Sequence, residues 1–313
     1  MKNNFYLGIY YDPIKPAQEW IINERVRNID KQFILDDLQH IKDLGLKYVR
    51  LPLRWILIEQ RKDKLDFSFY DWLLKRMESF DLTPCLIVGD DIPKWAWKKL
   101  NKNFSEFLIK SFNHFCFDSS LYQISNELDV GNKIPWKWSK EAKSDFLLEA
   151  AKIIRDKDKN SLIVINGFWD IYHNCSEYFK HLHDKNLDFD FIGIDHYAET
   201  NPFKKIENLN KLMSLVHRKF KKNLILTELG YSTWFPIKYT EHGQKKYIKK
   251  AFSVINKTSY LKGIFYFCLK DYDFFYHLIP TEEHFGLIKK NNRKKIGYYT
   301  FKNEMVNFRK KFV

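Results

Sequence analysis

Two glutamates follow short apolar runs at widely separated points of the sequence. Glu127 comes after the run 121–125 and one asparagine, Asn126, and Glu228 directly follows the run 224–227. If both runs are strands of one parallel sheet, both carboxylates leave that sheet at its carboxyl edge. Two convergent carboxyl groups, one protonated and one ionised, can cleave a glycosidic bond. A single glutamate at a strand end is often only an ion-pair partner, so this interpretation requires that the two meet.

Eight apolar runs recur along the chain, and each is followed by a segment with helical spacing of apolar residues. The runs are continuously apolar rather than alternating, which indicates strands buried on both faces. Their starts lie roughly 30–45 residues apart, about the length of one strand–helix unit. The expected strands are 5–11, 48–53, 84–89, 121–125, 162–166, 191–195, 224–227 and 263–269.

The segments between the runs predict amphipathic helices, among them 31–44, 209–220, 240–255 and 298–312. Ser68 is expected to cap one further helix, and Ser139 precedes another. Eight such units predict an α/β fold of the (β/α)8 TIM-barrel type, with a single domain over residues 1–313. The phosphate-binding motifs GxGxxG and GxxxxGK[ST] do not occur, which argues against a Rossmann or P-loop fold. In a barrel, the fourth and seventh strands face each other across the mouth.

The composition is basic, with 53 Lys+Arg against 39 Asp+Glu and a formal net charge of +14. Such a charge is compatible with a polyanionic partner. The lysines mostly fall at helical spacing, however, which favours solvated helix faces, and we expect neither a nucleic-acid nor a membrane partner. The four cysteines form no CxxC pair, the first residues lack the apolar run of a signal peptide, and no run approaches 18 apolar residues. These features predict a cytoplasmic protein.

The histidines do not have the spacing of a metal site. His181 and His183 lie two residues apart, which places them on different sides of a helix, and no HExxH motif occurs. We therefore expect neither a catalytic metal nor another cofactor.

Asn126-Glu127 on the fourth strand with Glu228 on the seventh resembles the large clan A of (β/α)8 retaining glycoside hydrolases. The pattern is closest to a short, divergent member of glycoside hydrolase family 1. The stretches that carry this likeness are 48–55, 82–84, 91–95, 190–197, 227–230 and 285–288. The chain differs where that family has a His-Trp pair, here near Gly89-Asp90, and where it has a Trp on the eighth strand, here Phe267.

The resemblance implies a role for each matching residue. Glu127 would be the general acid/base and Glu228 the nucleophile. Arg50 would lie beneath the nucleophile, Tyr197 would hydrogen-bond to it, and Asn126 would bind the 2-hydroxyl of the sugar. Charge supports the same assignment, because a cation and a hydroxyl donor next to Glu228 favour its ionised form.

Other polar and aromatic residues also follow the expected strands. Asp90, Asp195 and His196 are candidates for substrate binding, as are Trp95 and Trp234. Sugar sites combine polar groups with flat aromatic surfaces, and the tryptophans as a set favour a saccharide over a small charged metabolite. The tryptophans that follow strands are Trp55, Trp95, Trp97, Trp136, Trp138, Trp169 and Trp234.

The sequence therefore predicts a retaining hydrolase of β-linked glycosides that works by double displacement. Two alternatives stay open. A transglycosylase would use the same residues with a sugar in place of water, and a carbohydrate-binding barrel would use the same mouth without turnover. The expected partner is a saccharide or glycoside substrate. Its sugar and aglycone, exo or endo action, and the oligomeric state are not specified by these patterns.

Overall fold

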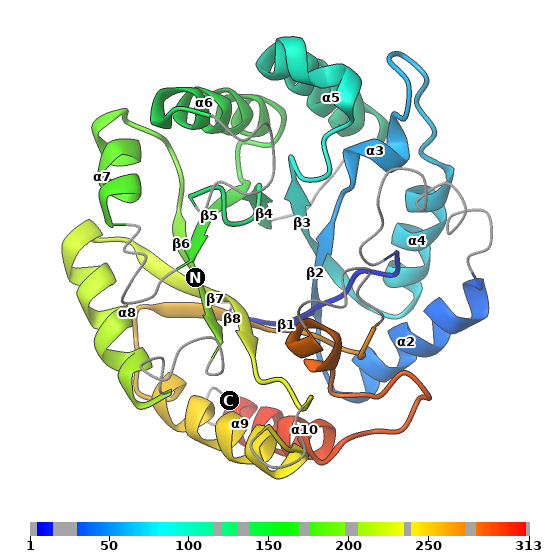
Figure 1. Cartoon of the computed structure of the whole chain (residues 1–313), viewed down its shortest axis with the longest axis vertical. Coiled ribbons are helices and arrows are strands. Elements are labelled where there is room, and N and C mark those ends of the chain that lie inside the picture. Colours follow the sequence, from blue (N-terminus) through cyan, green and yellow to red (C-terminus); the bar gives the residue numbers. More distant parts are fainter. Residues whose placement is uncertain are drawn as a thin grey trace.

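A computed structural model describes residues 5–14, 30–115, 121–129, 138–168, 176–197, 206–234, 239–272 and 280–310. Within them, eight parallel strands close into one barrel, each paired with the next in the sequence and β8 with β1 (Figure 1). The strands are β1 (Tyr6–Tyr10), β2 (Tyr48–Pro52), β3 (Thr83–Val88), β4 (Leu121–Ile124), β5 (Leu162–Phe168), β6 (Phe191–Tyr197), β7 (Asn223–Gly230) and β8 (Leu261–Tyr266). The predicted single-domain (β/α)8 TIM barrel is confirmed.

Each expected apolar run coincides with one strand, and the largest differences, of three residues, are at the ends of β7 and β8. β7 continues past the expected residue 227 to Gly230, whereas β8 was expected to continue to residue 269 but ends at Tyr266. The carbonyls of Cys268 and Leu269 instead accept hydrogen bonds from the amides of Leu287 and Ile288. This stretch therefore pairs with a later loop rather than continuing the barrel.

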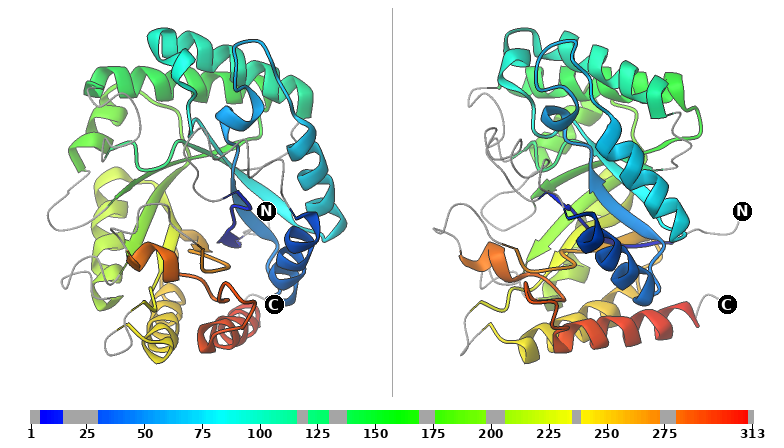
Figure 2. Two further views of the ribbon diagram at one scale, coloured as in Figure 1. Left: turned by 45° about the vertical axis from the view of Figure 1, so that its right-hand side comes forward. Right: turned by 90° about the vertical axis from the view of Figure 1, so that its right-hand side faces the viewer.

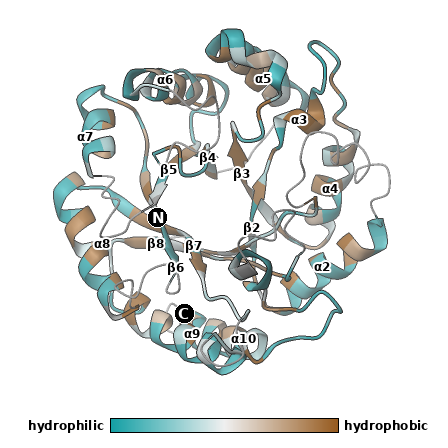
Figure 3. Cartoon of the chain, viewed as in Figure 1, coloured by the Kyte–Doolittle hydropathy of each residue, from teal (hydrophilic) through white to brown (hydrophobic). Residues whose placement is uncertain are grey.

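Helices form the outer ring of the barrel (Figure 1), and their apolar sides face the strands (Figure 3). They are α2 (Lys31–Asp43), α3 (Trp55–Ile58), α4 (Ser68–Ser79), α5 (Leu100–Phe115), α6 (Lys140–Lys157), α7 (Ser176–Asp184), α8 (Ile206–Phe220), α9 (Glu241–Ile255) and α10 (Ile296–Arg309), with the short 3₁₀ turns η1 (Lys94–Lys99) and η2 (Pro280–His284).

Side-chain caps explain where several helices begin. The hydroxyl of Ser139 accepts from the amide of Ala142, and that of Thr240 accepts from Gly243, which satisfies amides that lack a partner within the helix. The expectation that Ser68 caps α4 is wrong, because Ser68 is already the first helical residue. Asp66 lies two residues earlier, and its carboxylate accepts from the Ser68 amide instead.

The interior of the barrel is apolar at one end and polar at the other. Seven buried side chains, one from each strand except β2, fill the amino-terminal end: Tyr6, Cys85, Leu121, Val164, Phe191, Ile225 and Phe265. One layer higher, toward the carboxyl ends of the strands, the inward positions carry Arg50, Gln123, Asn166 and Asp195, all buried. The apolar layer supports a polar floor at the mouth, where the active sites of such barrels lie.

The segments after the strands share this mouth. The amide of Thr233, which follows β7, donates to the carbonyl of His284 at the end of η2. The side view in Figure 2 shows η2 at one end of the barrel.

Among the described helices, none is both long and apolar enough to cross a membrane.

Candidate active site

Glu228 projects into the mouth from β7, and both of its carboxylate oxygens are bound. Oε1 lies 2.7 Å from Nη1 of Arg50, and the hydroxyl of Tyr197 donates to Oε2. The register between β6 and β7 shifts just before Asp195, which is paired with Glu228. A buried guanidinium and a phenol that both donate to one carboxylate stabilise its ionised form.

The two groups that bind Glu228 keep their protons. Burial raises the pKa of Tyr197 well above its usual value, and the negative charge of Glu228 raises it further. Burial alone would lower the pKa of Arg50, but the charges of Glu228 and Asp195 outweigh it, so the net shift is upward. Tyr197 is therefore a neutral donor and Arg50 a permanent cation.

Glu127 lies just beyond the end of β4, on an unusual backbone. Ser125 and Glu127 have φ angles of 55° and 48°, in the left-handed region that costs most residues roughly 1 kcal/mol or more. Hydrogen bonds hold this turn. The Glu127 amide donates to Oδ1 of Asn166 at 2.9 Å, and the Asn126 amide donates to Oδ1 of Asp90 at 3.1 Å. The turn thus carries a half-buried carboxyl group into the mouth.

The two glutamates meet as predicted. Carboxylate oxygens of Glu127, Asp195 and Glu228 all lie within 4.8 Å of one another. Three such groups could hold a hard cation such as Ca²⁺. However, both oxygens of Glu228 already bind Arg50 and Tyr197, so a cation would compete with these donors. That the enzyme needs no metal stays a prediction.

Two residues of the polar floor were missed from the sequence. Gln123 accepts from Nε of Arg50 at 2.8 Å, and Asn166 donates to Oδ1 of Asn126 at 2.7 Å. Arg50 also donates through Nη2 to the same oxygen of Asn126 at 2.7 Å. Each missed residue is a polar side chain at an inward position of an otherwise apolar strand, and this was the signal available in the sequence.

Asp195 lies beneath the two glutamates and is fully buried. Its carboxylate accepts from Nδ2 of Asn166 at 2.7 Å and from the hydroxyl of Thr227 at 2.5 Å. Burial raises its pKa well above the usual value, and the charges of Glu228 and Glu127 add to the shift. Asn166 can lie this close to β6 because residue 193 is a glycine. A Cβ at Gly193 would lie 2.5 Å from the Cβ of Asn166. Asp195 therefore orients Asn166 and Thr227 from a position below the mouth.

His196 does not belong to the site, contrary to prediction. Side chains alternate between the two faces of a strand, so Asp195 and Tyr197 point into the barrel and His196 points out. Its Nδ1 lies 2.9 Å from the hydroxyl of Tyr247 on α9, and the two rings are stacked. Asp90, also predicted to bind substrate, accepts hydrogen bonds from the turn that carries Glu127.

The tryptophans take different positions. Trp55 is fully buried and stacks on Phe107, so it belongs to the core and does not line the mouth. Trp95 meets Trp55 edge-on and donates its indole N–H to the carbonyl of Glu59, which are packing contacts. Trp234 is half-buried after β7, where it stacks on Tyr239, and its sugar-binding role stays a prediction. Trp136 and Trp169 lie outside the described residues.

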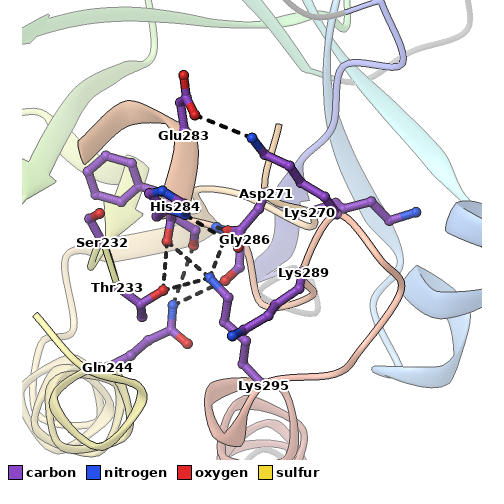
Figure 4. A network of polar contacts seen from close by, with 12 residues as sticks. Ser232, Thr233, Gln244, Lys270, Asp271, Glu283, His284, Gly286, Lys289 and Lys295 are labelled. Atoms are coloured by element: carbon purple, nitrogen blue, oxygen red, sulfur yellow. Dashed lines mark hydrogen bonds and ion pairs between the residues drawn. The ribbon is translucent and has the colours of Figure 1, made fainter. Parts of the chain in front are cut away.

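A buried lysine holds the loops on one side of the mouth. Lys295 precedes α10, is fully buried, and donates to Oδ1 of Asp271 at 2.7 Å and to the hydroxyl of Thr233 at 2.8 Å (Figure 4). It also donates to the carbonyl of His284. The next residue, Phe285, packs against the ring of Tyr197. This group, which we term the Lys295 clasp, links α10 to the surroundings of Glu228.

Comparison with known families agrees with this geometry. The model for glycosyl hydrolase family 53 matches residues 92–273, more than half of the chain and the part that contains both glutamates. The chain belongs to glycosyl hydrolase family 53. It is therefore a retaining O-glycosyl hydrolase of clan A with a carbohydrate substrate. The resemblance to family 1 identified the correct clan, but the matching family model is that of family 53.

Solved structures of other clan members share the fold of this family 53 chain. A family 5, subfamily 18 glycoside hydrolase from Streptomyces cattleya in complex with GlcNAc aligns with a TM-score of 0.78 at 12% identity, over 99% of this chain and 81% of that chain. Xylanase 10B from Thermotoga maritima gives 0.73 at 15% identity, over 99% and 97%. A family 1 β-glucosidase from Exiguobacterium antarcticum gives 0.73 at 15%, over 98% of each chain. No curated protein matches the chain. At these identities the likeness shows the fold alone.

Proposed function

We propose that this family 53 chain hydrolyses β-linked glycosides by double displacement, with Glu228 as nucleophile and Glu127 as general acid/base. The observation that carries the proposal is the approach of their carboxylate oxygens to within 4.8 Å. Double displacement needs carboxyl groups about 5–5.5 Å apart, whereas inversion needs about 6.5–9.5 Å to admit a water molecule. An approach within 4.8 Å fits the first class.

The two steps divide between the glutamates according to their surroundings. In the first step, an oxygen of Glu228 bonds to the anomeric carbon, and the bond from that carbon to the glycosidic oxygen breaks as Glu127 gives that oxygen a proton. In the second step, Glu127 takes a proton from water, whose oxygen displaces Glu228 from the anomeric carbon. Glu228, held by Arg50 and Tyr197, suits the charged role, and the half-buried Glu127 suits proton exchange.

Asn126 has a fixed orientation that suits it to substrate binding. Its Oδ1 accepts from Arg50 at 2.7 Å, from Asn166 at 2.7 Å and from Gln123 at 3.2 Å. These donors orient the amide so that its NH₂ group is available to a sugar. We assign this group to the 2-hydroxyl, where a hydrogen bond strengthens in the transition state.

Rescue by azide tests the assignment of the two glutamates. Glu127→Ala should still form the glycosyl-enzyme from a dinitrophenyl β-glycoside, because that leaving group needs no proton. Added azide should then give the β-glycosyl azide. Glu228→Ala cannot form the intermediate, so azide should enter from the opposite face and give the α product. The same azide stereochemistry from both variants, or wild-type rates in either, would show that the roles are wrong.

The two alternatives predict different experimental results. A transglycosylase would transfer the glycosyl group to an added sugar acceptor in preference to water, which product analysis measures directly. A binding barrel would show no turnover of any glycoside. Catalysis is favoured over binding alone because both carboxyl groups needed for it are present and meet at the mouth.

A further inference from the structure

Asn166, on β5, contacts the turn that carries Glu127, and every polar atom of its side-chain amide has a partner. Nδ2 donates to Oδ1 of Asn126 and to Oδ2 of Asp195, both at 2.7 Å. Oδ1 accepts from the amide of Glu127 at 2.9 Å. The residue is only 2% exposed, so these partners come from the protein rather than from solvent. One buried side chain therefore links the acid/base turn to β6.

These contacts allow only one orientation of the Asn166 amide. If its oxygen and nitrogen were exchanged, the oxygen would face the oxygens of Asn126 and Asp195. The NH₂ group would then face the backbone N–H of Glu127. Such buried contacts between two acceptors or two donors leave polar groups unpaired, which is unfavourable. The oxygen of Asn126 is itself fixed, because Arg50 donates to it. The neighbours of Asn166 thus direct its acceptor at the backbone of Glu127.

Asp195 maintains this orientation in either of its protonation states. Its Oδ1 lies 2.5 Å from the hydroxyl oxygen of Thr227, and its Oδ2 accepts from Asn166. Burial, and then the charges of the two glutamates, raise the pKa of Asp195. A proton on Oδ1 would be shared with the Thr227 hydroxyl and would leave Oδ2 as an acceptor. Asp195 can therefore orient Asn166 whether or not its carboxyl group is charged.

The turn that carries Glu127 is held from two sides. Ser125 and Glu127 both have positive φ angles, which persist only where the surroundings support them. On the β3 side, Asp90 accepts from the Ser125 hydroxyl at 3.2 Å and from the Asn126 amide at 3.1 Å. On the β5 side, Asn166 accepts from the amide of Glu127 itself. Loss of Asn166 would leave the start of the turn held and release the backbone of Glu127.

The nucleophile is held by other groups. Arg50 and Tyr197 bind the two carboxylate oxygens of Glu228, and neither of these contacts involves Asn166. Asn126 does contact Asn166, but its oxygen also accepts from two further donors. Removal of Asn166 should therefore affect the acid/base much more than the nucleophile.

We propose that Asn166 is a positioning residue for the acid/base, and that Asp195 orients it for this role. The hydrogen bond from the Glu127 amide to Asn166 fixes the backbone so that the Glu127 carboxyl group meets the glycosidic oxygen. A displacement of about 1 Å in a reacting group can lower a rate by roughly a hundredfold, so this bond can control the proton transfer. The proposal rests on the proposed function, because Glu127 is the acid/base only there.

The dependence of the rate on the leaving group tests this role. The probes are dinitrophenyl, 4-nitrophenyl and phenyl β-glycosides of whichever sugar the wild type cleaves fastest among glucose, galactose, mannose, xylose and their β-1,4-linked disaccharides. Dinitrophenolate leaves without a proton, whereas phenolate requires one from the acid. Leucine resembles asparagine in shape but has no polar atoms. In Asn166→Leu we expect kcat/KM to fall by about tenfold or more on the phenyl glycoside, but by less than about threefold on the dinitrophenyl glycoside.

The second step of the reaction gives an independent readout. Glu127 must also take a proton from water, so the glycosyl-enzyme formed from the dinitrophenyl glycoside should accumulate in Asn166→Leu. We expect kcat and KM to fall together on this substrate. Azide needs no base, so its addition should raise kcat by about threefold or more. A role of Asn166 in packing alone would not produce this response.

Variants of Asp195 test whether it orients Asn166. Asp195→Leu removes the acceptor for Nδ2 of Asn166 and should show the same selective loss on the phenyl glycoside. Asp195→Asn keeps an oxygen for Nδ2 and can donate to the Thr227 hydroxyl, so it should stay within about threefold of the wild type on every probe. Equal losses in Asp195→Leu and Asp195→Asn would contradict the orienting role.

Two controls separate positioning from general damage to the protein. Tyr197→Phe acts on the nucleophile and should lower kcat/KM by the same factor for every leaving group. Asn103→Leu removes another buried asparagine, on the outer helix α5, which donates to the carbonyl of Ala96 at 3.0 Å. It should lower the unfolding free energy and leave the dependence on the leaving group unchanged.

The outcomes separate this proposal from the proposed function. If Glu127→Ala loses activity selectively on the phenyl glycoside but Asn166→Leu does not, the positioning role is overturned and the catalytic assignment stands. If Glu127→Ala shows no such selectivity, or the wild type cleaves no glycoside, the proposed function fails.

Crystal structures of the variants test the positioning without turnover. The Glu127 carboxyl group should be displaced by about 1 Å or more in Asn166→Leu and should stay in place in Asn103→Leu. An undisplaced carboxyl group in Asn166→Leu would overturn the proposal. If Asn166→Leu does not fold, Asn166→Ala takes its place in every measurement, because the space it leaves can admit water to the unpaired groups.

Discussion

Two buried arginines, four residues apart, form ion pairs of similar chemistry with different consequences. Arg50 lies on β2, points into the barrel and binds Glu228, Gln123 and Asn126. Arg54 follows β2 and binds Asp12 after β1 and Asp91 after β3. The carboxylate bound by Arg50 has to react, whereas those bound by Arg54 only join loops. Position relative to the substrate therefore separates a catalytic ion pair from a structural one.

The largest effect on activity is expected from Arg50→Met. The variant leaves Glu228 buried without its counterion and removes the donor that orients Asn126. We expect kcat/KM on the preferred aryl glycoside to fall by roughly a thousandfold, as when a preorganised donor is removed from an active site. A loss below tenfold would show that Arg50 does not hold the nucleophile.

Arg54→Met should reverse the pattern by changing stability more than activity. It leaves Asp12, whose side chain is 2% exposed, without its buried partner. Breaking a buried pair in this way costs about 3–5 kcal/mol of unfolding free energy. Urea denaturation measures this cost, and removing both charges in Arg54→Met with Asp12→Asn should recover part of it. A stable Arg54→Met with strongly reduced kcat would place Arg54 with Arg50 instead.

Tyr197→Phe removes one hydrogen bond to Glu228 and keeps the ring that packs on Phe285. A hydrogen bond to a charged group contributes about 1.5–3 kcal/mol, so kcat/KM should fall by roughly ten- to a hundredfold. The unfolding free energy serves as the control and should change by far less than in Arg54→Met. Wild-type activity in Tyr197→Phe would leave Arg50 as the main support of the nucleophile.

The last effect concerns Asp195 and is the only one of the four that depends on pH. Its raised pKa means that the folded protein holds a proton that the unfolded chain has lost above about pH 4. Raising the pH through this window therefore reduces stability, by up to about 1.4 kcal/mol per pH unit. Asp195→Asn lacks this loss, so its unfolding free energy should rise relative to that of the wild type as the pH increases from 4 to 7. If the unfolding free energies of the two proteins changed with pH in the same way, the raised pKa of Asp195 would be contradicted.

The sequence predicted best those features that depend on a single residue or on a single continuous run of residues. Continuous apolar runs predicted all eight strands, because strands buried on both faces leave no polar alternation. Glu127 and Glu228 were placed correctly because both follow such runs. It was harder to predict which residues of a strand face the interior of the barrel. His196 was grouped with its neighbours Asp195 and Tyr197, although alternate residues of β6 face opposite sides.

Contacts between distant residues explain what the sequence did not reveal. Arg54 binds a residue 42 positions away and Lys270 binds Asp37 across the barrel seam, and neither pairing has a local pattern. Gln123 and Asn166 were missed because their partners come from other strands. The family likewise depended on comparing a long stretch of the chain, since short motifs at strand ends are shared across the clan.

The Lys295 clasp has a consequence for the order in which the protein is made. Glu127 and Glu228 both leave the ribosome before Lys295 does, so a nascent chain already carries the two reactive groups. It still lacks the ammonium group that joins Asp271, Thr233 and the His284 carbonyl, next to the ring that packs on Tyr197. The nucleophile is therefore synthesised well before its surroundings can be completed, because the contacts of Lys295 cannot form until the segment that leads into α10 has been made.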